Sequence, residues 1–133
     1  MSTLTGLATD IKDDRVERHV MSRRTYAIYQ TNAEYRFMRW NYAGSIDEKT
    51  GKRRFNWKDY KEVAGGVVHK EHASVMEVLS DLLYKYNMDI PLGYQGRSLS
   101  TSDIVCLREG SKEMYFYMDG VACVDITDEV LNP

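Results

Sequence analysis

Two histidines lie at the spacing that metal ligands on a helix would need. His69 and His72 flank Lys70-Glu71 and would share one helical face at positions i and i+3. A zinc site usually takes three or four ligands, and cysteines or carboxylates at characteristic spacings complete the set. The sequence offers no such partners, so we interpret this segment as a solvated helix entrance and expect no metal and no cofactor.

Three serines beside an aspartate raise the question of a nucleophile. Ser98, Ser100 and Ser102 precede Asp103. Nucleophilic catalysis needs a base that activates the hydroxyl and a third group that orients the base. The surrounding sequence has neither a histidine nor a G-x-S-x-G elbow. We therefore expect these hydroxyls to bond to nearby backbone amides of a turn.

Other catalytic patterns are missing as well. Gly65-Gly66 and the segment from Gly93 to Gly96 match neither a dinucleotide-binding loop nor a P-loop. The paired carboxylates Asp13-Asp14 and Asp128-Glu129 lie near the termini, where solvated charge is the ordinary case. The sequence thus indicates a protein without a catalytic centre and reveals no small-molecule substrate.

Positive charge and aromatic rings interleave between residues 36 and 57. Such a mixture can bind single-stranded nucleic acid through phosphate contacts and base stacking. Arg, Tyr and Trp are also the usual anchors of protein interfaces. From this pattern we predict six partner-binding residues: Arg36, Arg39, Trp40, Arg53, Arg54 and Trp57.

The same pattern has a purely structural explanation, in which the rings fill a core and the arginines cover its solvated side. Strand-like alternation favours this explanation for Tyr26, Tyr35 and Phe37, which we expect in the core. For Arg53, Arg54 and Trp57, in or beside a loop, both explanations stay open.

Composition indicates one ordinary domain. The chain has 133 residues, 43% of them hydrophobic and 29% charged, which is enough for a core without disulfide or metal support. We find no signal peptide and no apolar run of membrane-spanning length. Cys106 and Cys123 lie in apolar segments and are expected to be reduced. These observations predict a cytoplasmic protein without membrane contact.

Charge is unevenly distributed along the chain. From Arg15 to Lys61, twelve Lys or Arg residues stand against five Asp or Glu, and from Leu99 to Pro133 two stand against seven. Such a chain either presents one basic and one acidic surface to charged partners or folds so that the two parts neutralise each other.

Periodicity predicts two paired strands in the first half, over residues 25–30 and 35–40, because aromatic and β-branched residues alternate there. After a charged loop we expect a short helical turn within residues 57–63. Gly65-Gly66 should break that element, and residues 67–68 could begin a further strand.

One helix is predicted over residues 74–86. Ser74 and Glu77 form a capping box, and apolar residues recur at helical spacing. Asn87 suits a left-handed C-cap, and Pro91 follows it.

An antiparallel meander should follow, with strands at 104–107, 114–118 and 121–126 and a hairpin turn at Asp119-Gly120. We therefore predict an α+β fold: a small antiparallel sheet that includes the C-terminal three-strand meander, packed by one main amphipathic helix. Residues 1–22 would be a polar arm or a short helix, and residues 23–133 a single domain.

Three motifs of the second half share their order and spacing with a known family. Tyr86-Asn87 with Pro91 is similar to a motif F/Y-N-x-x-x-P that ends a helix. The segment GRSLSTSDIV at 96–105 is similar to G-H-S-L-S-x-S-D-V-V. Tyr117-Met118-Asp119 is similar to a closing motif Y-x-D. Through these motifs and the opening strand, residues 25–126 resemble the YodL-like domain, a family common in Firmicutes and often encoded on mobile genetic elements. The corresponding signature residues are Gly96, Arg97, Ser98, Leu99, Ser100, Ser102, Asp103, Tyr117 and Asp119.

The chain departs from the family pattern at three places. Arg97 replaces the family's histidine, so the resemblance supports no role that needs an imidazole. Residues 42–68 do not follow the usual spacing, and Val121 stands where an aromatic residue is common.

The resemblance implies no enzymatic activity, because none is established for the family. It implies a mobile-element setting, in which small accessory proteins act on a host component. We therefore expect a non-catalytic accessory protein that binds and inhibits a host protein such as a CRISPR or restriction effector. The alternative is a nucleic-acid-binding accessory protein of conjugation or replication.

Overall fold

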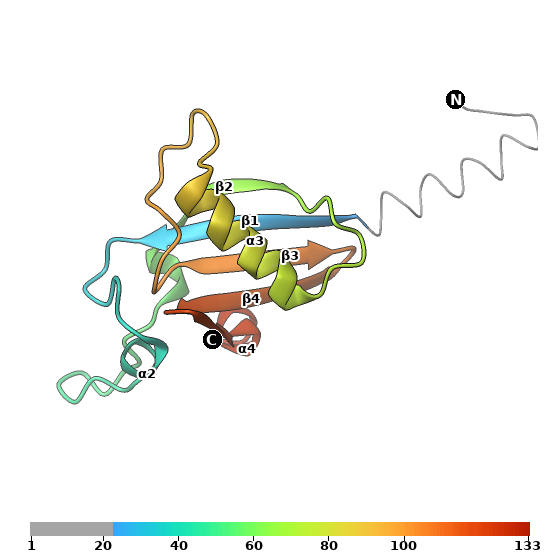
Figure 1. The fold of residues 1–133 in the computed structure, drawn as a ribbon. Coiled ribbons are helices and arrows are strands. Elements are labelled where there is room, and N and C mark those ends of the chain that lie inside the picture. The colour runs from blue at the N-terminus through green and yellow to red at the C-terminus, as the bar shows by residue number, and fades with distance from the viewer. Residues whose placement is uncertain (1–22) are drawn as a thin grey trace, which may run out of the picture.

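The computed structural model describes residues 23–133; the arm or helix predicted for residues 1–22 lies outside the described residues. Five strands form one antiparallel sheet in the order β2-β1-β3-β4-β5 (Figure 1). Consecutive pairing of the last three strands confirms the C-terminal meander and the α+β fold. The strands are β1 (Arg24–Thr31), β2 (Tyr60–Val67), β3 (Ile104–Glu109), β4 (Lys112–Asp119) and β5 (Ala122–Asp125).

The main helix, α3 (Val75–Met88), crosses one face of the sheet (Figure 1). It begins with the predicted capping box: the Ser74 hydroxyl accepts from the Glu77 amide at 3.1 Å, and the Glu77 carboxylate accepts from the Ser74 amide at 3.3 Å. The buried core between helix and sheet consists of Tyr26, Ile28, Ala73, Val78, Leu79, Leu82, Tyr86, Leu99, Val105, Leu107, Phe116 and Met118.

Asn87 does not cap α3 in the predicted way. The helix continues to Met88, and its C-cap, Asp89, has a φ of −137°, outside the left-handed region. The Asn87 side chain instead donates hydrogen bonds to the carbonyls of Leu83 and Leu99, both at 2.8 Å. The bond to Leu99 ties the end of the helix to the 96–105 segment.

The opposite face of the sheet is covered by the connection between β1 and β2 and by the C-terminal residues. The connection contains α2 (Trp40–Ala43) and the 3-10 helix η1 (Trp57–Asp59), and α4 (Thr127–Leu131) follows β5. Burial on both faces explains why β3 begins with four consecutive buried residues. The core on this second face consists of Ala27, Tyr35, Ala43, Phe55, Ile104, Cys106, Tyr115, Tyr117, Ile126 and Val130.

The strand predicted for residues 35–40 is wrong: residues 35–37 form a turn, and Trp40 begins α2. Phe37 has a φ of 68°, a value that no strand residue adopts. Its amide donates to the Ser102 hydroxyl at 2.8 Å instead of to a neighbouring strand. The partners of β1 are β2 and β3.

The predicted break at Gly65-Gly66 is also wrong, because β2 runs through both glycines. A Cβ at Gly66 would lie 2.9 Å from the Tyr26 hydroxyl oxygen, and one at Gly65 would lie 3.2 Å from the Tyr26 carbonyl oxygen. Gly66 therefore leaves room for the Tyr26 ring, whose hydroxyl shares a 2.7 Å hydrogen bond with Tyr86, and Gly65 lies close to the Tyr26 backbone. The helical turn predicted for residues 57–63 is confined to η1.

The two oppositely charged parts of the chain meet in the structure. Arg24 lies 3.9 Å from Glu109, and Arg39 lies 2.7 Å from Asp119. They therefore partly neutralise each other.

Cys106 and Cys123 are free thiols, as expected. Within residues 23–133 no helix has the length and apolar character that crossing a bilayer requires.

Candidate binding surface

The turn from Arg36 to Arg39 carries an exposed aromatic ring on an unusual backbone. Phe37 has a φ of 68° and is 48% exposed, so the expectation that its ring lies in the core is wrong. Met38 beside it is 43% exposed. A non-glycine residue in this left-handed region is strained and persists only where its surroundings hold it.

Ser102, which is distant from Phe37 in the sequence, fixes the backbone of Phe37. It has a positive φ of its own, 79°, and is fully buried. Its hydroxyl accepts the Phe37 amide at 2.8 Å across 65 residues. The prediction that this hydroxyl serves a local turn is therefore wrong, because it fixes a distant loop.

Two side chains of β4 hold the rest of the turn. The Tyr117 hydroxyl donates to the Met38 carbonyl at 2.6 Å. The Asp119 carboxylate accepts from Arg39 Nε at 2.7 Å, from Arg39 Nη2 at 3.1 Å and from the Trp40 amide at 3.1 Å. These bonds, led by that from Arg39, hold the pKa of Asp119 below its ordinary value.

Asp103, the residue after Ser102, is fully buried. Its Oδ2 accepts from Gln30 Nε2 at 3.0 Å and from the Ser100 amide at 2.9 Å, whereas Oδ1 has no hydrogen-bond partner among the described residues. Burial raises the pKa of Asp103 to about 6, and the hydrogen bonds from Ser100 and Gln30 oppose the shift.

Gln30 links this carboxylate to Arg97. Its side-chain oxygen accepts from the Arg97 amide at 2.9 Å, and its nitrogen donates to the Arg97 carbonyl, also at 2.9 Å. The Tyr94 hydroxyl donates to the same carbonyl at 2.6 Å. The backbone of Arg97 is therefore fixed from two sides.

The fixed backbone directs the Arg97 guanidinium toward Phe37. Nη1 donates to Asn32 Oδ1 at 3.0 Å and Nη2 to the Thr31 carbonyl at 2.7 Å. The guanidinium carbon lies over the Phe37 ring, 5.7 Å from its centroid, and that of Arg36 lies over the same ring at 4.7 Å. One exposed ring thus has two cations against it.

The remaining signature residues support this arrangement to different degrees. Leu99 fills the core under α3, whereas Ser98 is exposed. Gly96 lies against the Tyr94 ring, where a Cβ would clash with it.

A comparison with known families identifies the origin of this signature. The family model described as the YodL-like domain matches residues 25–128. The chain belongs to this family. No curated protein and no solved structure matches it. In this YodL-like chain the signature side chains Ser102, Tyr117 and Asp119 hydrogen-bond to the turn at 36–40, and Asp103 accepts a hydrogen bond from Gln30.

The two predicted tryptophans of the binding set lie against the second face of the sheet. Trp40 packs on Phe55 and Tyr117, with ring centroids 5.3 and 5.0 Å apart. Trp57 stacks on Tyr60 at 5.8 Å and meets Tyr29 edge-on at 4.6 Å. Both are only partly exposed.

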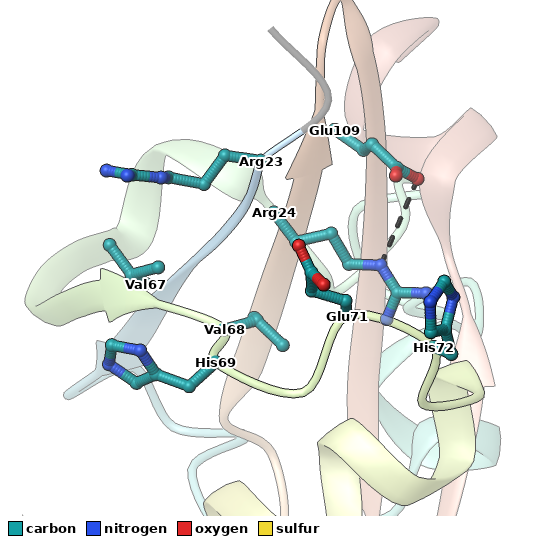
Figure 2. A pocket seen from close by; sticks show the side chains of 8 residues that line it. All are labelled: Arg23, Arg24, Val67, Val68, His69, Glu71, His72 and Glu109. Carbon is teal, nitrogen blue, oxygen red and sulfur yellow. Dashed lines mark ion pairs between the residues drawn. The ribbon is translucent and has the colours of Figure 1, made fainter. Parts of the chain in front are cut away.

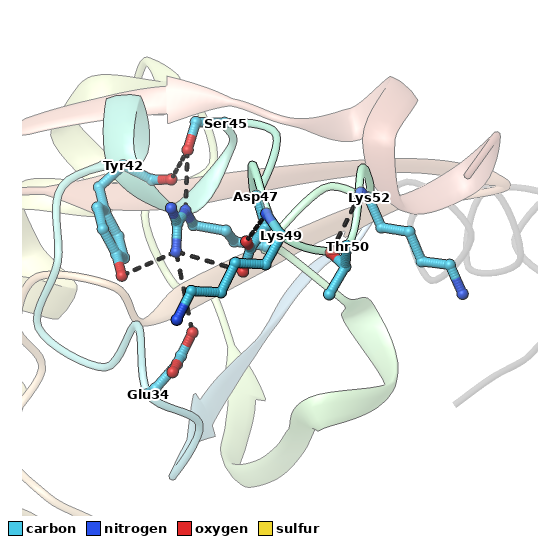
Figure 3. A network of polar contacts seen from close by, with 8 residues as sticks. Glu34, Tyr42, Ser45, Asp47, Lys49, Thr50 and Lys52 are labelled. Atoms are coloured by element: carbon cyan, nitrogen blue, oxygen red, sulfur yellow. Dashed lines mark hydrogen bonds and ion pairs between the residues drawn. The ribbon is translucent and has the colours of Figure 1, made fainter.

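Figure 3 shows a polar network that includes Glu34, Tyr42, Ser45 and Asp47. Arg54, in the loop that precedes η1, donates to the Tyr42 hydroxyl at 3.1 Å and the Ser45 hydroxyl at 3.2 Å, and lies 3.7 Å from Asp47 and 4.0 Å from Glu34. Arg53 is exposed, and its side chain donates to the Gly44 carbonyl at 3.1 Å.

The two histidines line a separate pocket at the beginning of β1, together with Arg23, Arg24, Glu71 and Glu109 (Figure 2). His69 and His72 lie on different sides of this pocket (Figure 2). In the part of the chain that the structure describes, no three His, Cys, Asp or Glu side chains could jointly hold a metal ion.

Sequence reasoning missed Phe37, Met38 and Gln30 as parts of the surface or its support. Their roles depend on contacts between residues 65 to 80 positions apart, such as that from Phe37 to Ser102. The signature residues were the one available signal, because they hold this turn.

Proposed function

We propose that the protein is a non-catalytic binding module whose partner contacts the turn formed by Arg36, Phe37 and Met38. The observation that carries the proposal is the exposed Phe37 ring on a strained backbone that the signature residue Ser102 holds in place. Strain of this kind costs stability and clusters where a protein binds or reacts. Exposed aromatic, Met and Arg side chains together are typical of the centre of protein interfaces.

The other residues of the predicted binding set favour a protein partner over a nucleic acid, because most of them already make contacts within the chain. Trp40 and Trp57 pack against the sheet and do not offer free faces for base stacking. Arg39 and Arg54 already face carboxylates within the chain. The surface that remains combines apolar atoms with few cations, which suits a protein.

The resemblance to proteins of mobile elements supports a specific setting for this module. We propose that it acts in the cytoplasm as an accessory protein of such an element, and that its partner is a host protein that it inhibits. A defence effector, of the CRISPR or restriction type, fits this proposal.

Nucleic-acid binding is the second candidate, favoured by one observation. Arg36 and Arg97 flank the Phe37 ring in a way that could stack a base and contact a phosphate. Binding of this kind weakens steeply between about 50 and about 300 mM salt.

Capture from a host lysate tests the proposal. The tagged full-length chain is incubated with lysate with and without nuclease, and bound proteins are identified by mass spectrometry. We expect one protein to be captured reproducibly, with the nuclease making no difference. Loss of all capture after nuclease treatment would establish the second candidate, and no capture in either sample would contradict both.

A further inference from the structure

A polar recess is lined in part by Arg97, whose guanidinium also lies over the Phe37 ring. It has a volume of about 430 Å³ and brings together residues from the ends of β1 and β2 and from the signature segment. Its charged lining residues are Lys61, Arg97 and Asp59, and the Asp59 carboxylate accepts a 2.7 Å hydrogen bond from the Tyr35 hydroxyl. The amide side chains of Asn32 and Gln95 add further hydrogen-bonding groups. The recess therefore carries more positive than negative charge.

Unlike most other arginines of the described chain, Arg36 and Arg97 form no ion pair, although the charge of Arg97 acts on the buried Asp103 and lowers its pKa against the larger effect of burial. Arg39 and Arg108 lie within 2.8 Å of a carboxylate, and Arg24 and Arg54 within 3.9 Å. Arg97 instead donates to two neutral oxygens, those of Asn32 and Thr31.

Arg36 is exposed, and within residues 23–133 its guanidinium contacts the Phe37 ring and forms no ion pair. Two guanidinium groups that form no ion pair in the described chain therefore lie against one exposed apolar ring.

Such an arrangement matches a particular ligand chemistry. A guanidinium prefers a carboxylate or phosphate oxygen pair, to which it can donate two parallel hydrogen bonds. Phe37 and Met38 would bury apolar side chains next to that contact. A segment in which acidic and apolar residues alternate satisfies both requirements at once.

We propose that Arg36, Phe37, Lys61 and Arg97 form a receptor for an acidic, apolar segment of the partner protein. This inference rests on the proposed function and names the chemistry of its partner. A carboxylate enters the recess beside Arg97 and Lys61, a second faces Arg36, and an apolar side chain of the segment covers Phe37. Complementary charge steers the segment to the surface, and the apolar contact holds it.

A titration with a defined peptide tests this receptor. The isotope-labelled full-length chain is titrated by NMR with a blocked hexapeptide of alternating Glu and Leu at about 50 mM salt, a level at which charge attraction is little screened. We expect saturable shifts of the Phe37 amide and of the Arg36 and Arg97 Nε–H signals. A matched peptide of Gln and Leu should produce none at the same concentration.

Matched charge reversals locate the contact. Arg36→Glu should weaken peptide binding about tenfold, whereas Lys112→Glu, at the exposed turn between β3 and β4, changes the net charge equally and should leave it unchanged. Equal weakening by both variants, or no shifts at the three signals, would overturn the inference. So would tighter binding of single-stranded oligothymidylate at the same residues, which would assign the cluster to nucleic acid.

The lysate capture separates this inference from the function on which it rests. If Arg36→Glu and Lys112→Glu capture the same protein as the unaltered chain in equal amount, the binding function stands and the acidic receptor is wrong. If only Arg36→Glu loses the captured protein, both are supported.

Discussion

The fold changes the protonation of Asp103, a fully buried carboxylate. It is fully buried, its Oδ2 accepts from Gln30 and Ser100, and its Oδ1 has no partner in the described chain. Burial raises its pKa from 3.8 to about 6, so the folded state binds the Asp103 proton more tightly than the unfolded chain. Its contribution to stability is therefore fully present below its unfolded pKa and is lost as pH rises through about 6.

Asp103→Asn should remove this pH dependence. The amide stays neutral and its oxygen can still accept from Gln30 and Ser100. We expect the free energy of unfolding of the variant, relative to the unaltered chain, to rise by about 2 kcal/mol between about pH 4 and about pH 7.5. Urea denaturation at several pH values measures it. A difference between the two proteins that does not change with pH would contradict this account.

The strained backbone of Phe37 leads to a second prediction, which concerns the stability of two variants at this residue. Phe37→Ala removes the ring but keeps a side chain at a φ of 68°, whereas Phe37→Gly removes both ring and strain. We expect the glycine variant to be more stable than the alanine variant by about 1 kcal/mol. Thermal and urea denaturation give the comparison. If the alanine variant proved the more stable one, the backbone would not be strained as described.

Among the elements, those with strong local signals were predicted from sequence. The capping box at Ser74 placed the start of α3 correctly, and the turn at Asp119-Gly120 placed the last hairpin. Their signals lie within a few neighbouring residues, so no distant contact was needed.

The elements that were mispredicted depend on distant contacts. Residues 35–40 alternate like a strand, but the Ser102 and Tyr117 side chains hold them as a turn. Gly65-Gly66 looks like a break, but Gly66 leaves the space that the Tyr26 ring requires. Only part of the candidate surface was predicted, for the same reason. Arg36 was predicted from the local mixture of positive charge and aromatic rings, whereas the exposure of Phe37 depends on residues far away in sequence.

The loop before η1 provides a test between two adjacent arginines. Arg54 is only 23% exposed and interacts with Asp47 and Glu34, whereas Arg53 makes one bond to a carbonyl. Arg54→Glu should lower the free energy of unfolding by about 2 kcal/mol, because it places a third carboxylate beside two others. Arg53→Glu should change it by less than about 1 kcal/mol. Urea denaturation measures both, and equal effects would show that the network does not stabilise the loop.

At the scale of the whole molecule, one sheet separates two cores, and its signature end displays the candidate surface. The helix side is closed by α3, and the other side by the β1–β2 connection and α4. Ion pairs between Arg24 and Glu109 and between Arg39 and Asp119 neutralise part of the positive charge of the first half with negative charge from the C-terminal part. Arg36 and Arg97, which form no ion pair within residues 23–133, lie against Phe37 at this end.

The central claim is that a partner protein binds through Phe37. The most direct measurement is the amount of partner captured from nuclease-treated lysate by the unaltered chain, by Phe37→Ala and by Tyr84→Ala, which removes a 64% exposed ring from the outer side of α3. We expect capture by Phe37→Ala to fall about tenfold, as for an interface hot spot, and capture by Tyr84→Ala to stay unchanged. Equal capture by Phe37→Ala and the unaltered chain would contradict the account.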